Sequence, residues 1–84
     1  MSDEEFEVID HLYFVTSYED LKDLSNMGNA ELLEVLISLI TKGWVKCFSG
    51  PDNEIRIAEV DLQMNYYKYE YLATKQGLLA HNMR

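Results

Sequence analysis

The stretch NAELLEVLISLITKGWVKCF, residues 29–48, contains a long and mostly apolar segment, a glycine, and a second apolar segment. Asn29 is a favoured residue for capping the first turn of a helix, and the glutamates that follow it place negative charge near the positive end of the helix dipole. Gly43 stands where glycine commonly ends a helix. The pattern predicts a helix that begins at Asn29 and ends before Gly43, followed directly by a strand over 44–48.

The apolar side of this predicted helix is unusually wide. At about 100° per residue, its polar side chains fall in one narrow arc. They are Glu31, Glu34, Ser38, Thr41 and Lys42. The remaining apolar arc is roughly twice the ~100° stripe that a surface helix needs. Either the chain's own domain covers both sides of the helix, or a second subunit covers the surplus.

Length and composition restrict the class of protein. The chain has 84 residues, enough for one small domain, and we assign 1–84 to it. With 48% apolar residues it belongs among globular chains, and no segment approaches the ~20 apolar residues of a membrane span. The acidic start MSDEEFE is unlike a signal peptide, and one cysteine cannot form an internal disulfide. We therefore expect a cytoplasmic protein without membrane contact.

The net charge of −8 is unevenly distributed along the chain. Residues 1–40 carry ten acids and one base, which gives −9, and residues 41–84 carry five acids and six bases, which gives +1. Domains that bind duplex DNA usually carry a basic patch. The first half therefore repels polyanions, and only the second half could tolerate them.

Capping signals divide the N-terminal part into two further helices. Ser2 with Glu5 forms a capping box, and apolar residues recur at helical spacing after it, which predicts a helix over 3–15. Ser17 with Asp20 is a second capping signal and predicts a helix over 18–26. A short turn containing Gly28 then leads into the helix at Asn29, so that two helices joined by a tight turn form a helix-turn-helix.

The C-terminal part has the pattern of a β-hairpin followed by a helix. The turn residues 49–53 separate the strand over 44–48 from a predicted strand over 54–58. Residues 61–65 fit a strand, a helical turn or a loop. Tyrosines alternate with charged residues over 66–72, which predicts a half-buried strand. Thr74 can cap a last short helix that ends near His81.

This order of elements is that of a winged helix-turn-helix domain. The segment YEDLKDLSNMGNAELLEVLISLITKGWVKCF, residues 18–48, resembles the second helix, turn, third helix and first wing strand of bacterial winged-helix regulators. YLATKQGLLAH, residues 71–81, is similar to the segment after the wing in several such families, with its aromatic-x-x-Thr-x-x-Gly pattern. The resemblance covers residues 4–80. It implies an α+β fold of three N-terminal helices, an enlarged hairpin wing and a short C-terminal helix.

The resemblance also implies where DNA would be contacted. In those regulators the third helix lies in the major groove. Its matching outward positions here are Glu31, Glu34, Ser38 and Thr41, none of them a cation. Phosphate contact would rely on the wing. The candidate DNA contacts are Ser38, Thr41, Lys46, Arg56 and Lys68, with Lys75 as a further cation. Because winged helices also serve as protein-docking modules, the acidic third helix favours protein contact over DNA.

No grouping of residues points to catalysis, a metal or a cofactor. His11, Cys47 and His81 lie far apart and lack the spacing of zinc ligands, and nothing supplies an activated nucleophile. We therefore expect no enzyme activity, and Cys47 is expected to be a buried strand thiol.

Tyrosine is enriched at protein interfaces, and winged helices often dimerise through their first helix, last helix and wing. The candidate partner interface is Phe6, Tyr13, Tyr67 and Tyr69. The sequence thus predicts a non-enzymatic regulatory or adaptor module that contacts protein, as a homodimer or with another chain. The alternative is a sequence-specific DNA-binding regulator.

Overall fold

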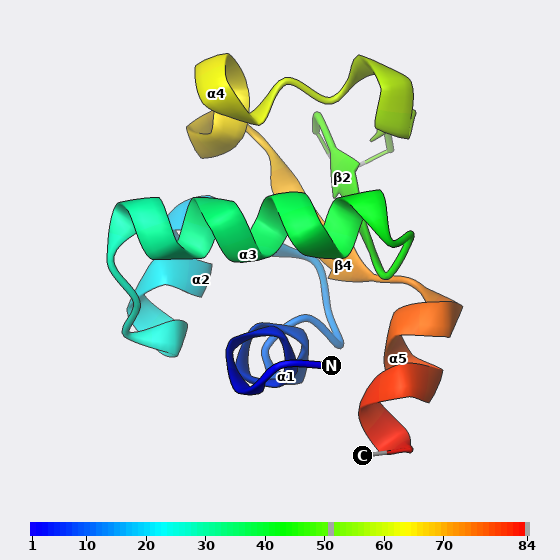
Figure 1. Ribbon diagram of the computed structural model, residues 1–84. Helices are drawn as coiled ribbons and strands as arrows, with labels where there is room; N and C mark the ends of the chain where they lie inside the picture. The colour runs from blue at the N-terminus through cyan, green and yellow to red at the C-terminus, as the bar shows by residue number, and fades with distance from the viewer. Residues whose placement is uncertain (51, 84) are drawn as a thin grey trace.

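The computed structural model describes residues 1–50 and 52–83, and its elements alternate between helices and short strands (Figure 1). The α-helices in this part of the chain are α1 (Asp3–Asp10), α2 (Tyr18–Ser25), α3 (Asn29–Thr41), α4 (Leu62–Asn65) and α5 (Lys75–Asn82). The strands are β1 (Thr16–Ser17), β2 (Val45–Phe48), β3 (Glu54–Ile55) and β4 (Glu70–Ala73). Two 3₁₀ turns, Ile57–Glu59 and Tyr66–Lys68, flank α4. The predicted α+β class is confirmed.

The four strands form one antiparallel sheet in the order β1-β4-β2-β3. Val45 pairs with Ala73 and Cys47 with Tyr71 between β2 and β4, and Thr16 of β1 pairs with Tyr71 from the other side. The inward residues Val45, Cys47 and Tyr71 are fully buried. The strand that comes last along the chain thus lies between two earlier ones.

Helix α3 lies at the centre of the molecule, with elements on both of its sides. Figure 1 shows α1 and α2 on one side of α3 and the segment that carries α4 on the other. Its buried residues are Leu32, Leu36, Leu39 and Ile40, which join the core that also contains Val8, Ile9, Leu12 and Leu21. The predicted apolar surplus is covered only in part, since Ile37 remains 46% exposed.

The first helix is shorter than its predicted range of 3–15. The capping box at Ser2 and Glu5 forms as predicted, but α1 ends at Asp10 with His11 as its C-cap. The chain then turns so that the carbonyl oxygen of Leu12 accepts a hydrogen bond from the backbone N–H of Ala73, at 2.9 Å. Residues 12–15 of the predicted helix are not helical, and the strand β1 begins directly after them at the β-branched Thr16.

The start of α3 differs from the prediction in its capping residue. Gly28, not Asn29, is the N-cap, and it supplies no side-chain hydrogen bond. The Asn29 amide oxygen instead accepts a hydrogen bond from the hydroxyl of Tyr18. The predicted cap of α2 is confirmed, since Ser17 accepts from the backbone N–H of Asp20. Asn29 is therefore the first residue of α3, as predicted, and its side chain joins α3 to α2.

The strands after Gly43 are shorter than predicted. Of the predicted strand 54–58, only β3 forms, because the chain turns into a 3₁₀ helix at Ile57. For residues 61–65 the sequence allowed a strand, a helical turn or a loop. The structure shows a helical turn, in which the Asp61 side chain accepts a hydrogen bond from the backbone N–H of Met64. Residues 66–68 of the predicted strand 66–72 are also 3₁₀, so β4 begins at Glu70. In the predicted turn 49–53, residue 51 lies outside the described residues.

The junction between β2 and α5 is unusually close. Thr74 caps α5 as predicted, accepting from the backbone N–H of Gly77 at 3.1 Å, and its hydroxyl donates to the carbonyl oxygen of Gly43 at 2.6 Å. A β-carbon added at Gly77 would stand 2.1 Å from the carbonyl oxygen of Trp44. The Thr-x-x-Gly part of the sequence pattern therefore holds the last helix directly against the start of β2.

Candidate functional site

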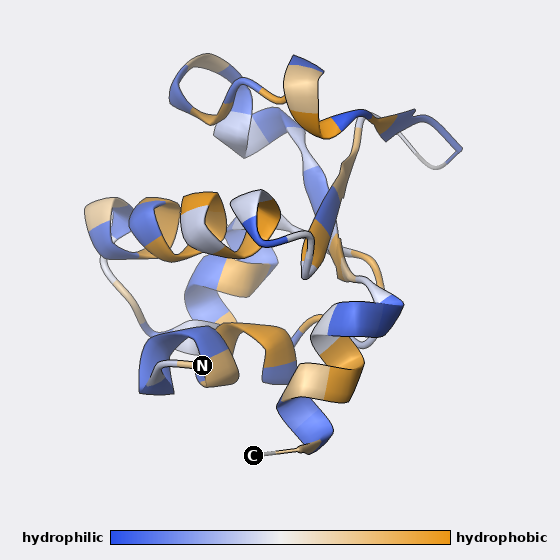
Figure 2. Ribbon diagram, turned by 45° about the vertical axis from the view of Figure 1, so that its right-hand side comes forward, coloured by the Kyte–Doolittle hydropathy of each residue, from blue (hydrophilic) through white to orange (hydrophobic). Residues whose placement is uncertain are grey.

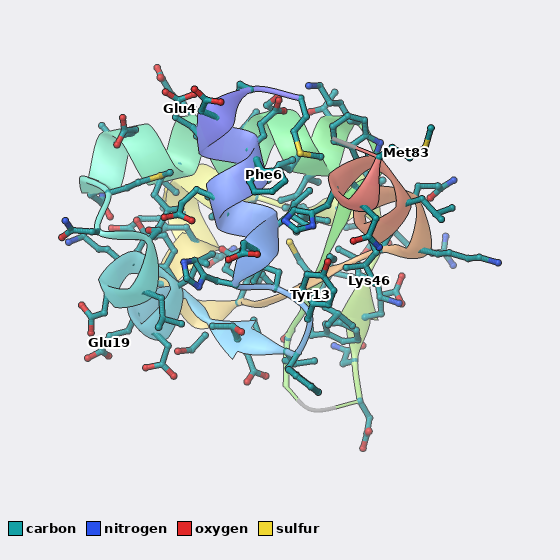
Figure 3. The ribbon with its side chains drawn as sticks, turned by 90° about the horizontal axis from the view of Figure 1, so that it is seen from below. Glu4, Phe6, Tyr13, Glu19, Lys46 and Met83 are labelled. Atoms are coloured by element: carbon teal, nitrogen blue, oxygen red, sulfur yellow. The ribbon has the colours of Figure 1, made fainter. Side chains whose placement is uncertain are left out.

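Two of the predicted interface residues, Phe6 and Tyr13, meet at His81. The Phe6 ring stacks on the His81 imidazole with 4.1 Å between ring centroids and 15° between planes. The Tyr13 hydroxyl lies 2.9 Å from His81 Nδ1 and donates to Asn82 Oδ1 at 3.2 Å. Figure 3 shows both labelled side chains on the side of α1 that faces α5. This aromatic cluster joins α1, the loop after it and α5.

His81 is the buried centre of that cluster. Its side chain is only 9% exposed, and its Nε2 lies 3.4 Å from Asp10 Oδ1. Among the described residues, Nε2 has no partner with hydrogen-bond geometry. The Asp10 carboxylate therefore supplies a negative charge beside the ring, and the cluster ties α5 to the end of α1.

The other two predicted interface residues, Tyr67 and Tyr69, lie outside this cluster. They also differ in how much of their side chain is exposed. Tyr69 is 7% exposed and its hydroxyl accepts a hydrogen bond from the backbone N–H of Asp61 at 3.2 Å, so it belongs to the core. Tyr67 is 61% exposed and packs edge-on against Tyr66. The alternating tyrosines therefore do not form one continuous surface.

Large apolar side chains are exposed in both segments that the Tyr13–His81 contact joins, the loop after α1 and α5. In the loop after α1, Phe14 is 83% exposed and Val15 and Tyr13 are also exposed. On α5, Leu79 and Met83 are exposed, and Met83 reaches 84%. Figure 3 places the labelled Tyr13 beside α5 and Met83 at its end. We call Tyr13, Phe14, Val15, Leu79 and Met83 the loop–α5 face.

The cations that were predicted to contact DNA interact with different neighbours, and most of these neighbours are acids. Lys46 Nζ lies 3.6 Å from Glu54 Oε1, and Arg56 Nε lies 4.0 Å from Glu59 Oε1. Lys68 lies over the ring of Tyr67, with 5.6 Å to its centroid. Ser38 donates to Glu5 and is half-buried, whereas Thr41 is exposed. The geometry gathers these residues into no basic surface.

Glu5 is a buried carboxylate that links α1 to α3. Its Oε2 accepts hydrogen bonds from Lys42 Nζ at 2.7 Å and from the Ser38 hydroxyl at 2.9 Å, and its Oε1 accepts from the backbone N–H of Ser2. Burial acts to raise the pKa of Glu5, but these hydrogen bonds and the charge of Lys42 together lower it to about 2. The group is therefore a structural anion.

Two hollows lie on either side of the exposed surface of α3, which we call its outward ridge. The first, of about 240 Å³, has both apolar and polar residues in its lining and lies between α3 and the segment 57–63; we call it the α3 groove. Its lining includes Ile37, Ile40, Ile57, Val60 and Leu62. The second, of about 420 Å³, lies between α3 and the start of α1; we call it the acidic hollow. Its lining includes Glu4, Glu5, Glu31 and Glu34. The sequence predicted neither hollow, although it placed the acidic residues of the third helix on one side of that helix.

The thiol and the buried phenols are not activated for chemistry. Cys47 is 1% exposed, as predicted, and burial raises its pKa to about 12. Burial also raises the pKa of Tyr71 and that of Tyr18 above their usual range, and Tyr71 donates its hydroxyl hydrogen to the carbonyl oxygen of Tyr66. These groups keep their protons at neutral pH and serve packing.

One group of metal-type ligands escaped the sequence reasoning. Ligand atoms of Glu7, Asp10 and His11 all lie within 4.8 Å of one another at the end of α1. Their spacing of three and four residues places them on one helix face, which is the signal that could have found them. The two carboxylates are exposed, and acids at a helix end commonly cluster without a ligand.

Among residues 1–50 and 52–83, no helix has the length and apolar character needed to cross a membrane. Comparisons of the chain with protein-family models, with curated proteins and with solved structures found no match.

Proposed function

We propose that this chain is a winged-helix domain of the regulatory or adaptor kind, which carries out no chemistry and acts by contact with protein, as a homodimer through the loop–α5 face. The element order supports the winged-helix part of the proposal. α2 and α3 are joined by three residues, and the β2–β3 hairpin and the returning strand β4 follow. The short β1 pairs with the returning strand β4, so the sheet packs beside the three helices.

The observation that carries the proposed function is the exposure of five large apolar side chains on the loop–α5 face. Exposed apolar side chains that lie together on a small domain commonly mark an interaction surface. The contact of Tyr13 with His81 and Asn82 holds the loop and α5 together, so that the face has a fixed shape. A preformed face of this kind loses little freedom on binding.

The charge distribution favours a second copy as the occupant. Two copies with a net charge of −8 repel each other, so self-contact is least costly where carboxylates are absent. Neither 11–18 nor 71–84 contains an acid. The fold brings these acid-free segments together at the loop–α5 face, because Tyr13 contacts His81. A two-fold contact there buries apolar surface, and the Asp10 carboxylate beside His81 is the acid that borders it.

Light scattering over a concentration series tests this proposal. We expect a mass approaching twice the 9.8 kDa of one chain as concentration rises. Phe14→Ser with Leu79→Ser is expected to weaken self-association by about tenfold or more, since two apolar contacts are lost, while circular dichroism stays that of a folded chain. Leu24→Ser, at a 55% exposed position on α2, is the matched control and is expected to leave the dimer intact.

A chain that stays monomeric at millimolar concentration would rule out the homodimer. A dimer that Phe14→Ser with Leu79→Ser leaves unchanged would rule out the loop–α5 face. Tyr67→Ala tests whether the wing contributes to the dimer, as the sequence predicts, because Tyr67 is exposed and lies outside the loop–α5 face.

A further inference from the structure

The outward ridge of α3 separates surfaces of different character. At about 100° per residue, the order around the helix runs from Ile40 and Ile37, through Ala30, Thr41 and Glu34, to Ser38 and Glu31. The first pair lines the α3 groove and the last pair lines the acidic hollow. The ridge between them includes the small residues Ala30 and Thr41, both exposed. A segment of another chain can therefore approach the helix closely and reach both hollows at once.

The α3 groove has the size of an anchor site for side chains. Its volume of about 240 Å³ is below the 300–1,000 Å³ typical of cofactor and drug-sized pockets. Ile37 and Ile57 line it and are 46% and 56% exposed, so apolar surface is open to water there. Figure 2 shows hydrophobic positions on both α3 and the segment that passes above it. One or two apolar side chains from outside would cover this surface.

The acidic hollow carries more negative charge than its neighbours neutralise. Glu5 is paired with Lys42. Among the described residues, Glu4, Glu31 and Glu34 have no basic group within 4.0 Å, and all three are exposed. Carboxylates grouped in this way repel phosphate and attract cationic side chains. The charge of the hollow therefore selects against nucleic acid and in favour of Lys and Arg.

We infer that the outer face of α3 binds a short amphipathic segment of a partner protein, which places an apolar anchor in the α3 groove and Lys or Arg side chains in the acidic hollow. The inference rests on the proposed function, since it names the partner of a module that acts by protein contact. It uses a different surface from the dimer. None of the five residues of the loop–α5 face lines the α3 groove or the acidic hollow.

The mode of binding follows from the geometry of the ridge. A helical segment that crosses α3 presents residues at spacings of three and four on one face, which is the usual helix-in-groove pattern. Its apolar residues would enter between Ile37 and Ile57, and cationic residues about one turn away would extend over Thr41 and Glu34. The groove supplies affinity and the carboxylates supply orientation and charge selectivity.

Fluorescence anisotropy with three labelled peptides of about four helical turns tests the inference. The first carries a Leu stripe flanked by Lys, the second replaces each Lys with Glu, and the third replaces each Leu with Ala. We expect saturable binding of the first peptide with Kd at or below about 100 µM at low salt. The other two are expected to bind at least about tenfold more weakly.

Matched variants locate the binding surface on the protein. Glu34→Lys and Ile57→Ser are each expected to weaken the first peptide about tenfold. Glu19→Lys changes the net charge equally but lies on α2, which Figure 3 shows away from Glu4. Leu24→Ser removes an apolar side chain that is 55% exposed, against 56% for Ile57, outside both hollows. Both controls are expected to bind the peptide normally.

Three results would overturn the inference. They are absence of binding by the Leu and Lys peptide, equal binding of the Ala-substituted peptide, and equal weakening by Glu19→Lys and Glu34→Lys. Equal weakening would mean that net charge alone attracts the peptide. Light scattering on the same variants separates the two proposals, because Glu34→Lys and Ile57→Ser leave the loop–α5 face untouched. Loss of self-association in either would place a second copy on α3 instead.

Discussion

At the scale of single residues, Glu5 is a buried carboxylate paired with Lys42. It is 5% exposed, and its carboxylate is held by Ser2, Ser38 and Lys42. A buried charge costs free energy unless its partners remain in place. The pair with Lys42 therefore ties the start of α1 to the end of α3, beside the acidic hollow.

The pKa of Glu5 makes this tie dependent on pH. Because the pKa falls from its ordinary 4.5 to about 2 on folding, the carboxylate stabilises the fold above about pH 4.5. That contribution is lost as the pH falls towards 2. We expect Glu5→Gln to lower the free energy of unfolding by about 2 kcal/mol at pH 7 and by much less near pH 2.

Urea denaturation of the wild type and of Glu5→Gln at several pH values measures this difference. Glu4→Gln is the control, because Glu4 is exposed and has no basic partner among the described residues. A loss of stability in Glu5→Gln that is the same at pH 7 and pH 2.5 would contradict the assigned role of the charge.

At the scale of elements, the sequence pattern around Thr74 has a physical explanation. The aromatic residue, Tyr71, is fully buried in β4, and Thr74 caps α5 while bonding the carbonyl oxygen of Gly43. Gly77 lies against the Trp44 carbonyl, where a side chain has no room. Each position of the pattern thus meets a separate requirement for docking α5 on the sheet.

Gly77→Ala tests the close approach between α5 and β2. The new β-carbon would meet the Trp44 carbonyl oxygen at 2.1 Å, so α5 must move away. We expect a loss of about 2 kcal/mol in the free energy of unfolding, with a change in Trp44 fluorescence. Gln76→Ala, at the exposed preceding position, is expected to leave both unchanged. Unchanged stability of Gly77→Ala would show that α5 shifts freely.

Apart from the cap at Asn29, elements set by local signals were predictable, and those set by distant contacts were not. Side chains within three residues of the helix start decide the caps at Ser2, Ser17 and Thr74, and all three were predicted correctly. The end of α1 depends instead on the hydrogen bond from Ala73 to Leu12. Likewise Tyr67 continues the alternating pattern of Tyr69, yet the 3₁₀ turn leaves it exposed. Such contacts leave no periodic trace in the sequence.

The candidate surfaces show the same division. Phe6 and Tyr13 were singled out by residue type, and the structure brings them together at His81. Phe14, Leu79 and Met83 were missed as a group, because residue type alone does not tell whether an apolar side chain is exposed or lies in the core. Both hollows depend on how 57–63 and the start of α1 lie beside α3, which only the folded chain shows.

At the scale of the whole molecule, the distribution of charge supports the proposal of a protein partner over DNA. The cations Lys46 and Arg56 are beside acids, and the outward ridge of α3 carries Glu34. Phosphate binding needs cations that are free to replace counterions. The surface that a DNA-reading helix would use is acidic on one side and borders 57–63 on the other.

Random duplex DNA provides the corresponding test. We expect no change in the anisotropy of a labelled duplex at low salt up to about 100 µM protein, since non-specific binding by a cationic surface has a Kd at or below that range. Lys46→Ala with Lys68→Ala serves as the paired variant. Tight binding that weakens steeply with salt and is lost in this variant would instead favour a DNA-binding regulator.

The position of β4 has a consequence for the synthesis of the chain. Of the four described strands β4 is made last, yet it lies between β1 and β2, and Thr16 pairs with Tyr71, which is made 55 residues later. Until the ribosome has released Glu70–Ala73, β1 has no neighbour, and Val45 and Cys47 lack the strand that covers one edge of their sheet. A nascent or truncated chain that stops before β4 therefore exposes apolar surface to chaperones and proteases.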